Sequence, residues 1–558
     1  MFGLVCSVPI ATRLRPAWLV LVLWLATVNA AGQLAIGVQT QGSLLVGQDK
    51  LAGEARIEAF DSYGVTIADL DGDGRPELIA MNDNSRVYVI DTATHRVRAE
   101  ITTAHPGGKT AWHTQSLNGV AVADMDGDGL QELLILNSGG MLTRLERDPD
   151  LDTPAVLGLR KEWAVLAHAP AFQPRFWDER PWFTPTKAAD TPQLAHSAAV
   201  VAAPAPEAAQ SWVYVQSDGL SGQFAFDHEG RLQWLEAWQD GHAGPWVGAM
   251  GGRQTVLFAS DAGELTARNA QTGQLVWQRQ VGPKVSPGSH SVGPVVADLD
   301  GDGRQEIFVA ARNVASGVDW MQRSHAQLEL LDDQGALLWS VQHPEGNPMV
   351  HSRAIPHDVN RDGVLDLVVL DWNTIGRKPG NWERLGPGNL FGLDGRNGSV
   401  LWSIAIEAPA TDFDLALADT DEGRVALVPH AVAGRHGLAT IQLDDGRLLA
   451  WQELPDGWNT TRGATLVPTS KGGWEAWVAM DRPGLDCAPK EDVACRDGAF
   501  AVLPLRTSGP TPQGLAPAAL PSEALEAVTG DADPLAAGGV LPLAFVASVV
   551  WALRTRRD

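Results

Sequence analysis

The chain has 558 residues, of which 44% are hydrophobic, and it carries 67 acidic against 42 basic residues, for a net charge of −25. This surplus of acidic groups argues against DNA or RNA as a partner, because nucleic-acid binding needs clustered Lys and Arg. The length exceeds one ordinary domain unless structural repeats stack into a single large core.

The N-terminal segment has the order of a secretory signal. Arg13 and Arg15 precede an apolar run over residues 17–28, and small residues ending at Ala30 precede a cut before Ala31. We therefore predict a signal peptide over residues 1–30 and an exported mature chain. The segment that follows, residues 34–46, is expected to form a strand before the first repeat.

An acidic nonapeptide recurs four times, at residues 69–77, 124–132, 298–306 and 358–366. Oxygen side chains occupy positions 1, 3, 5 and 9, and glycine occupies position 6, where the backbone must turn sharply. With the carbonyl of position 7, this set of hard oxygen ligands suits Ca²⁺ better than Mg²⁺ and predicts about four calcium sites. The predicted ligands are Asp69, Asp71, Asp73, Arg75, Glu77, Asp124, Asp126, Asp128, Leu130, Glu132, Asp298, Asp300, Asp302, Arg304, Glu306, Asp358, Asn360, Asp362, Val364 and Asp366.

Position 12 separates these loops from an EF-hand. An EF-hand needs a bidentate Glu there, whereas the four loops have Ala80, Ile135, Val309 and Val369. Apolar runs on both sides of the loops indicate a strand, a metal loop and a second strand. The alternative, a solvated Asp-Gly turn without metal, is common for a single loop but improbable for four matching ones.

The strand that leads into D-x-D-x-D-G-x-x-[DE] resembles the FG-GAP or VCBS-type calcium repeats of β-propellers such as the integrin α-subunit head. Residues 263–277 and 391–402 look like the outer hairpin of quinoprotein-type propeller blades, in which a turn joins two strands and the second ends in Trp. The two resemblances together cover roughly residues 60–505. Both imply an all-β propeller.

The number of outer strands gives the number of blades. Their ends are expected near Val97, Trp163, Trp234, Trp277, Trp339, Trp402, Trp451 and Leu503. This count favours eight blades over residues 31–505, with seven as the alternative, and residues 34–46 are a candidate ring-closing strand for the last blade. The 21 Trp residues suit wedges packed between sheets, although a carbohydrate-binding platform is the other interpretation.

Histidine precedes Ser or Thr at the lead-in to several inner strands, at His113, His196, His290 and His351. In a propeller such positions ring the central axis, where four imidazoles would form a site for a transition metal or an anionic ligand. The simpler interpretation is that these residues close turns and cap strand ends. A fifth acidic segment, residues 419–424, has lost a residue before its glycine, and we predict that it binds no metal.

The C-terminal part has three features. Cys487 and Cys495 form a close pair that favours a disulfide in an exported chain, with free thiols as the alternative. Residues 506–534 have the Pro-rich composition of a linker. Residues 535–553 lack charge and precede three arginines, so residues 535–558 are expected to be a transmembrane anchor with a cytoplasmic basic tail. They also resemble the Gly-Gly type C-terminal sorting signals of Gram-negative bacteria.

The sequence has no nucleophile elbow, no H-E-x-x-H motif and no P-loop. It also lacks the adjacent cysteines that quinoprotein dehydrogenases usually carry. We therefore expect an exported, anchored, calcium-binding propeller at the cell envelope or surface that binds a protein or glycan. The alternatives are a polysaccharide-acting or redox enzyme that uses the axial histidines, and a scaffold for envelope assembly.

Overall fold

The structure is a computed structural model. It describes residues 38–40, 43–46, 65–81, 86–102, 120–136, 141–153, 156–166, 198–204, 210–217, 222–237, 244–260, 263–282, 293–314, 324–342, 348–350, 354–373, 375–378, 381–384, 388–407, 415–455, 458–469, 473–483 and 496–505. The chain divides into two compact units, residues 1–527 and 528–558, and every described residue belongs to the first. The regular structure of the described residues is all β, apart from one 3₁₀ helix, η1 (Pro149–Leu151).

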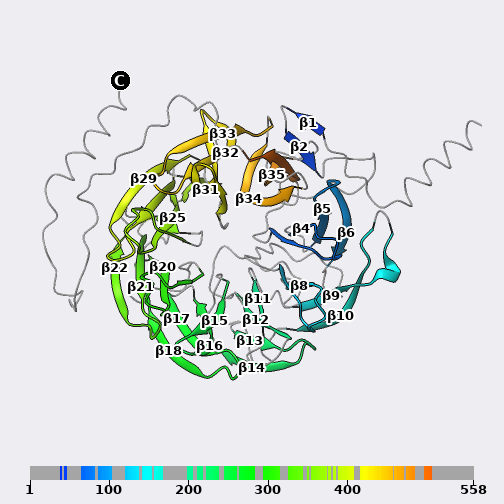
Figure 1. Ribbon diagram of the computed structural model, residues 1–558, viewed down its shortest axis with the longest axis horizontal. Coiled ribbons are helices and arrows are strands. Elements are labelled where there is room, and N and C mark those ends of the chain that lie inside the picture. The colour runs from blue at the N-terminus through cyan, green and yellow to red at the C-terminus, as the bar shows by residue number, and fades with distance from the viewer. Residues whose placement is uncertain are drawn as a thin grey trace, which may run out of the picture. The chain divides into compact units, whose positions relative to one another are not determined.

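Eight antiparallel sheets of four or five strands follow one another along the first unit, and Figure 1 shows them arranged around a central axis. This is a β-propeller with eight blades, as the sequence predicts, and not seven.

The first four blades are built as follows. Blade 1 consists of β3 (Val65–Ala68), β4 (Glu77–Met81), β5 (Arg86–Asp91) and β6 (Arg96–Thr102). Blade 2 consists of β7 (Val120–Ala123), β8 (Glu132–Leu136), β9 (Met141–Arg147) and β10 (Leu159–Leu166). Blade 3 consists of β11 (Ala198–Pro204), β12 (Ser211–Ser217), β13 (Gly222–Phe226) and β14 (Leu232–Ala237). Blade 4 consists of β15 (Trp246–Met250), β16 (Arg253–Ala259), β17 (Glu264–Asn269) and β18 (Leu275–Gln280).

The next three blades keep this order, with one insertion. Blade 5 consists of β19 (Val295–Ala297), β20 (Glu306–Val314), β21 (Ser324–Leu331) and β22 (Leu337–Gln342). Blade 6 consists of β23 (Pro348–Val350), β24 (Ile355–His357), β25 (Asp366–Asn373), β28 (Gly388–Leu393) and β29 (Val400–Ile406). Between its middle strands a separate hairpin is inserted, β26 (Ile375–Lys378) with β27 (Asn381–Arg384). Blade 7 consists of β30 (Ala416–Thr420), β31 (Gly423–Val432), β32 (Arg435–Gln442) and β33 (Leu448–Glu453).

Blade 8 closes the ring with strands from both ends of the propeller. It contains β34 (Asn459–Thr469), β35 (Gly473–Pro483) and β36 (Arg496–Pro504), followed by β2 (Ser43–Val46) and β1 (Val38–Thr40). Strand β2 pairs with β36, so that Leu45 lies opposite Ala501. For the described part of residues 34–46, the expectation of a ring-closing strand is thereby confirmed. Leu503, however, lies on the third strand of blade 8 and not on an outer strand, because β2 takes the fourth place.

The core lies between the faces of neighbouring blades. Leu134 of blade 2 packs in one cluster with Phe224 of blade 3, and Leu328 of blade 5 packs with Phe391 of blade 6. Apolar residues pack on both faces of the middle strands, and β8, β13 and β28 are buried at every position. Each blade is thus stabilised mainly by its two neighbours, as expected for a ring of repeats.

Tryptophans on the fourth strands join consecutive blades. Trp163 donates from Nε1 to the carbonyl of His228 at 2.9 Å, in the turn between the third and fourth strands of the next blade. The same bond to the next blade is made by Trp234, Trp277, Trp339 and Trp402. Trp451 bonds to His430 of its own blade instead. In blade 1 the register places Ala99, rather than the predicted Val97, at the equivalent position, opposite Val89.

Candidate metal loops

The four acidic nonapeptides join β3 to β4 in blade 1, β7 to β8 in blade 2, β19 to β20 in blade 5 and β24 to β25 in blade 6. We call them loop 1 (residues 69–77), loop 2 (124–132), loop 3 (298–306) and loop 4 (358–366). The predicted unit of strand, loop and strand is confirmed in all four. The position-6 glycines have positive φ, for example +81° at Gly74 and +93° at Gly129, a backbone conformation that favours glycine.

Side-chain oxygens bond to backbone N–H groups and fix the shape of each loop. In loop 1, Asp69 Oδ2 accepts from the Gly74 N–H at 2.9 Å, and Asp73 Oδ1 accepts from the Arg75 N–H at 2.8 Å. Both bonds recur at the same positions of loops 2, 3 and 4. The aspartates therefore organise the turn themselves, and their remaining oxygens are gathered in a small volume.

The position-9 carboxylates lie at the start of the second strands and are buried. Glu77, Glu132, Glu306 and Asp366 are 3%, 0%, 8% and 1% exposed, respectively. In each loop one oxygen accepts from the N–H of position 2, as in the 2.5 Å bond from Met125 to Glu132 Oε2. Burial raises the pKa of Glu77 and of Glu132 to about 7, and it also raises the pKa of Glu306 and of Asp366.

Three of the loops gather carboxylates closely enough to share one cation. In loop 2, Asp124, Asp126, Asp128 and Glu132 each offer an oxygen, and these oxygens all lie within 4.8 Å of one another. The corresponding groups are Asp69, Asp71 and Glu77 in loop 1, and Asp298, Asp300 and Asp302 in loop 3. Among the described residues, Glu132 Oε1 is buried without a hydrogen-bond partner, which leaves a desolvated carboxyl oxygen at the cluster. A set of hard oxygen donors with such an orphaned atom fits a calcium ion.

Loop 4 is built differently. Position 3 is the neutral Asn360, and position 9 is the shorter Asp366. Asp366 accepts from the N–H groups of Val359 and Asn360 with one oxygen and from the Gly395 N–H at 2.9 Å with the other. Among the described residues, this loop does not form a carboxylate group as close as those of the other three.

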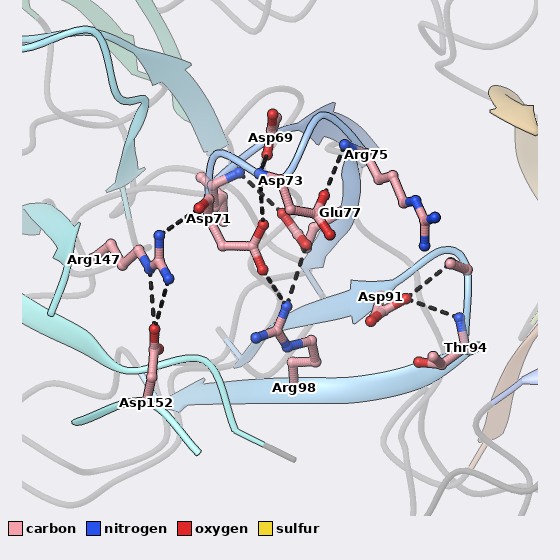
Figure 2. A network of polar contacts seen from close by, with 12 residues as sticks. Asp69, Asp71, Asp73, Arg75, Glu77, Asp91, Thr94, Arg98, Arg147 and Asp152 are labelled. Atoms are coloured by element: carbon pink, nitrogen blue, oxygen red, sulfur yellow. Dashed lines mark hydrogen bonds and ion pairs between the residues drawn. The ribbon is translucent and has the colours of Figure 1, made fainter. Parts of the chain in front are cut away.

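Two arginines that sequence reasoning missed lie against loops 1 and 2. Figure 2 shows the guanidinium of Arg98, from β6, directed at Asp71 and Glu77, with distances of 2.5 Å to Asp71 Oδ2 and 3.6 Å to Glu77 Oε1. Arg144, from β9, donates to Asp126 Oδ2 at 2.6 Å and lies 3.5 Å from Glu132 Oε2. Both arginines are distant from their loop in sequence, so only the strand register identifies them.

Each loop also contacts the following blade. Arg147 of blade 2 donates to the Asp71 carbonyl and pairs with Asp152 (Figure 2). Ser211 of blade 3 donates to the Asp124 carbonyl at 2.8 Å.

Loops 3 and 4 touch one another through the Leu365 N–H, which donates to the Leu299 carbonyl at 2.7 Å. Asp444 of blade 7 contacts His357, next to loop 4, at 2.7 Å. The loops thus lie at junctions between blades and are hydrogen-bonded to the neighbouring sheet.

The other predicted sites fall largely outside the described residues. This holds for His113, His196, His290 and His351, for Cys487 and Cys495, and for the segments 1–30, 506–534 and 535–558. In the part of the chain that the structure describes, no helix has the length and apolarity needed to cross a bilayer. The fifth acidic segment forms a tight turn between β30 and β31, in which Thr420 lies opposite Gly423.

Fold and loops together define an eight-bladed β-propeller of the FG-GAP and quinoprotein-like type. A family model described as FG-GAP-like repeat matches residues 69–135, which include loops 1 and 2. A second model, described as Outer membrane protein assembly factor BamB, matches residues 191–318 and 225–469. Because the latter matches reach half of the 558 residues, the chain belongs to the family that this second model describes. No match was found among the curated proteins.

Solved propellers superpose on most of the chain at low sequence identity. Sqt1 from Saccharomyces cerevisiae is 10% identical, with a TM-score of 0.50 over 84% of this chain and 100% of its own. BamB from Moraxella catarrhalis is 15% identical, with a TM-score of 0.43 over 81% of this chain and 100% of its own. The Vibrio cholerae biofilm matrix protein Bap1 is 12% identical, with a TM-score of 0.46 over 85% of this chain and 91% of its own. At these identities the likeness concerns the fold alone.

Proposed function

We propose that this chain is an exported, membrane-anchored β-propeller that binds calcium in its acidic loops and acts as an interaction module for a protein or glycan. The observation that carries the proposal is the carboxylate cluster of loop 2, in which three more exposed aspartates gather around the buried Glu132 with its orphaned Oε1, repeated in related form in loops 1 and 3. Calcium would supply the positive charge that lets crowded carboxylates lie together. The family models, which describe FG-GAP-like repeats and an envelope protein, support an extracytoplasmic location.

The residues that would hold the ions are the predicted ligands of each loop. Asp69, Asp71 and Glu77 in loop 1 and the four carboxylates of loop 2 would bind through their side chains. The loops also contact the next blade through Arg147, Ser211 and Leu365. An ion that orders a loop would therefore stiffen the junction between two blades, which makes calcium a structural component of the propeller.

The topology separates this metal face from the opposite face of the ring. In every blade the strands are antiparallel, so the loops between first and second strands and the turns between third and fourth strands lie on one face. The long connections between blades, such as residues 103–119 and 167–197, leave from strand ends on the other face. We infer that the opposite face carries the ligand-binding surface and that the metal face rigidifies it, because ligand sites lie preferentially on loops held by a rigid scaffold.

Three experiments test the proposal. Isothermal titration of the metal-free protein with CaCl₂ should give several saturable sites, and absence of binding at millimolar calcium would contradict the metal part. A glycan array and a pull-down from envelope extract, each run with and without EDTA, test the interaction part. Calcium-dependent retention of a defined glycan or protein supports it, whereas no retention in either assay contradicts it.

A scaffold role in envelope assembly is the second candidate, favoured by the BamB description of the matched family model. It predicts that the retained partner is an envelope protein rather than a glycan. The enzymatic alternative depends on His113, His196, His290 and His351, which lie outside the described residues, and it stays a prediction.

A further inference from the structure

We propose that Arg144 and Arg98 are resident counter-ions that compete with calcium, so that loops 2 and 1 bind the ion more weakly than loop 3 and stay folded without it. The inference rests on the proposed function, namely that the loops bind calcium. It adds that the affinity of each loop is set by a residue outside the nonapeptide.

Arg144 reaches loop 2 from within the blade. Its side chain is only 6% exposed, and Nη2 lies 2.6 Å from Asp126 Oδ2, 3.5 Å from Glu132 Oε2 and 3.8 Å from Glu146 Oε2. Nη1 donates to the His228 carbonyl of blade 3 at 3.3 Å, and the buried Nε has no partner. A buried guanidinium is costly unless carboxylates compensate it, so the loop and the arginine stabilise one another.

Arg98 reaches loop 1 from a different strand. It lies in the bulge of β6 between Val97 and Ala99, where the register with β5 shifts. Nη1 contacts Asp71 Oδ2 at 2.5 Å and Glu77 Oε1 at 3.6 Å. Two strands in two blades thus bring one guanidinium to the same pair of ligand positions, 3 and 9, which are the positions expected to hold the cation.

In the part of the chain that the structure describes, loop 3 has no such group, and the strand register shows why. Arg144 lies opposite Leu134 in blade 2, and the matching residue of blade 5, opposite Phe308, is Leu330. The bulge position of Arg98 is matched by Leu338. Among the ion pairs of the described residues, none joins an arginine to Asp298, Asp300 or Asp302, and Arg304 of the loop pairs with Asp333 instead. Within the described residues, no guanidinium from outside loop 3 therefore compensates its three aspartates.

The positive charge of each arginine should weaken calcium binding at its loop. Calcium at loop 2 would lie within a few ångströms of a fixed positive charge, and like charges at that distance in a partly buried site repel one another. Affinity of oxygen sites also depends on the number of uncompensated ligand charges. We therefore expect loop 3 to be occupied first as calcium rises, and loops 1 and 2 to follow at calcium concentrations at least about tenfold higher.

The test is a CaCl₂ titration of the full chain, stripped of divalent ions, by calorimetry, together with melting in EDTA and in calcium. Arg144→Gln should tighten one weak site about tenfold, leave the number of sites unchanged and lower the melting temperature more in EDTA than in calcium. The control Arg160→Gln, on an exposed side chain paired with Glu162, should change neither. An unchanged or weaker affinity in Arg144→Gln would overturn the inference.

Two further variants distinguish a change in calcium affinity from a folding defect of Arg144→Gln. Arg98→Gln should tighten a second weak site in the same way. Leu338→Arg places a guanidinium at the exposed bulge beside loop 3, where the side chain is 52% exposed, and it should weaken the tightest site. If no variant shifts its site while calcium still binds, the inference fails and the proposed function stands. If the wild-type protein binds no calcium at all, both fail.

Discussion

The indole of Trp234 in blade 3 lies directly against Gly273, in the hairpin turn of blade 4. A Cβ added at Gly273 would lie 2.7 Å from Trp234 Cδ2, closer than side chains tolerate. Gly273 also has a φ of +70°. The pair recurs as Trp163 with Gly230, Trp277 with Gly335, Trp339 with Gly398 and Trp402 with Gly446. The absence of a side chain at this position is what lets one blade dock on the next.

Gly273→Ala should therefore destabilise the propeller through two effects. The alanine is strained at positive φ, which costs about 1–2 kcal/mol, and its methyl group overpacks against Trp234, which costs about 1–3 kcal/mol more. Gly252→Ala is the matched control, because Gly252 has a φ of +75° with nothing within 4 Å of the added Cβ. Urea unfolding of both variants measures the difference. An equal loss of unfolding free energy in the two variants would show that the contact with Trp234 does not require glycine at position 273.

The ring closure gives a second prediction. Leu45 lies in β2, which is flanked by β36 on one side and β1 on the other. Leu45→Pro removes a backbone N–H inside the sheet and should cost about 3 kcal/mol or more. Gln39→Pro, in the edge strand β1, should cost much less. Limited proteolysis and melting distinguish the two, and indistinguishable variants would contradict a closing role for β2.

A third prediction concerns the loss of folding stability at acidic pH. His430 is 2% exposed, its Nδ1 accepts from the Glu407 N–H at 3.0 Å, and burial lowers its pKa from 6.5 to about 4. The unfolded chain therefore binds this proton more readily than the folded chain. Stability from the neutral ring is complete above about pH 6.5 and is lost as pH falls to about 4, by at most about 3 kcal/mol.

The measurement is the difference between wild type and His430→Gln, since the glutamine oxygen can accept the same N–H. Chemical unfolding at saturating calcium between pH 4.5 and 7 should show a shallower pH dependence in the variant. Parallel curves would mean that His430 does not titrate in this range.

Site deletion gives a fourth prediction. Asp71 belongs to the carboxylate group of loop 1. Asp71→Ala should lower the calcium stoichiometry by one and leave the remaining sites with their own affinities. Asp421→Ala, in the tight turn between β30 and β31, is the control and should bind as wild type. A lower calcium stoichiometry in Asp421→Ala, or an unchanged one in Asp71→Ala, would contradict the assignment of a calcium ion to loop 1.

The sequence predicts the loops and the blade number well, because each of these depends on residues within a few positions of one another. The nine residues of loop 2 contain every carboxylate of its cluster, and Trp277 and Trp402 each end a hairpin that is recognisable in the sequence. Local patterns of this kind can be recognised in the sequence without knowing how distant strands pair.

The features that sequence reasoning missed depend on register between strands. Arg144 meets Asp126 only because β9 lies two strands from the loop, and Arg98 meets Asp71 only because a bulge turns it inward. A one-residue shift in either strand would direct the guanidinium elsewhere. Ala99 was missed in favour of Val97 for the same reason. The place of Leu503 was misassigned because the fourth strand of blade 8 comes from the other end of the chain.

The most direct test of the central claim is melting of the full chain in about 1 mM calcium and in EDTA. Ions that bind only the folded state stabilise it by RT ln(1 + [L]/Kd). A Kd of about 0.1 mM at loops 1 and 2 gives about 1.4 kcal/mol each, and a Kd about tenfold lower at loop 3 gives about 2.7 kcal/mol, for a total of about 6 kcal/mol. We predict a large and reversible fall in melting temperature on chelation, restored by adding calcium back. Identical melting curves in calcium and EDTA would contradict the account.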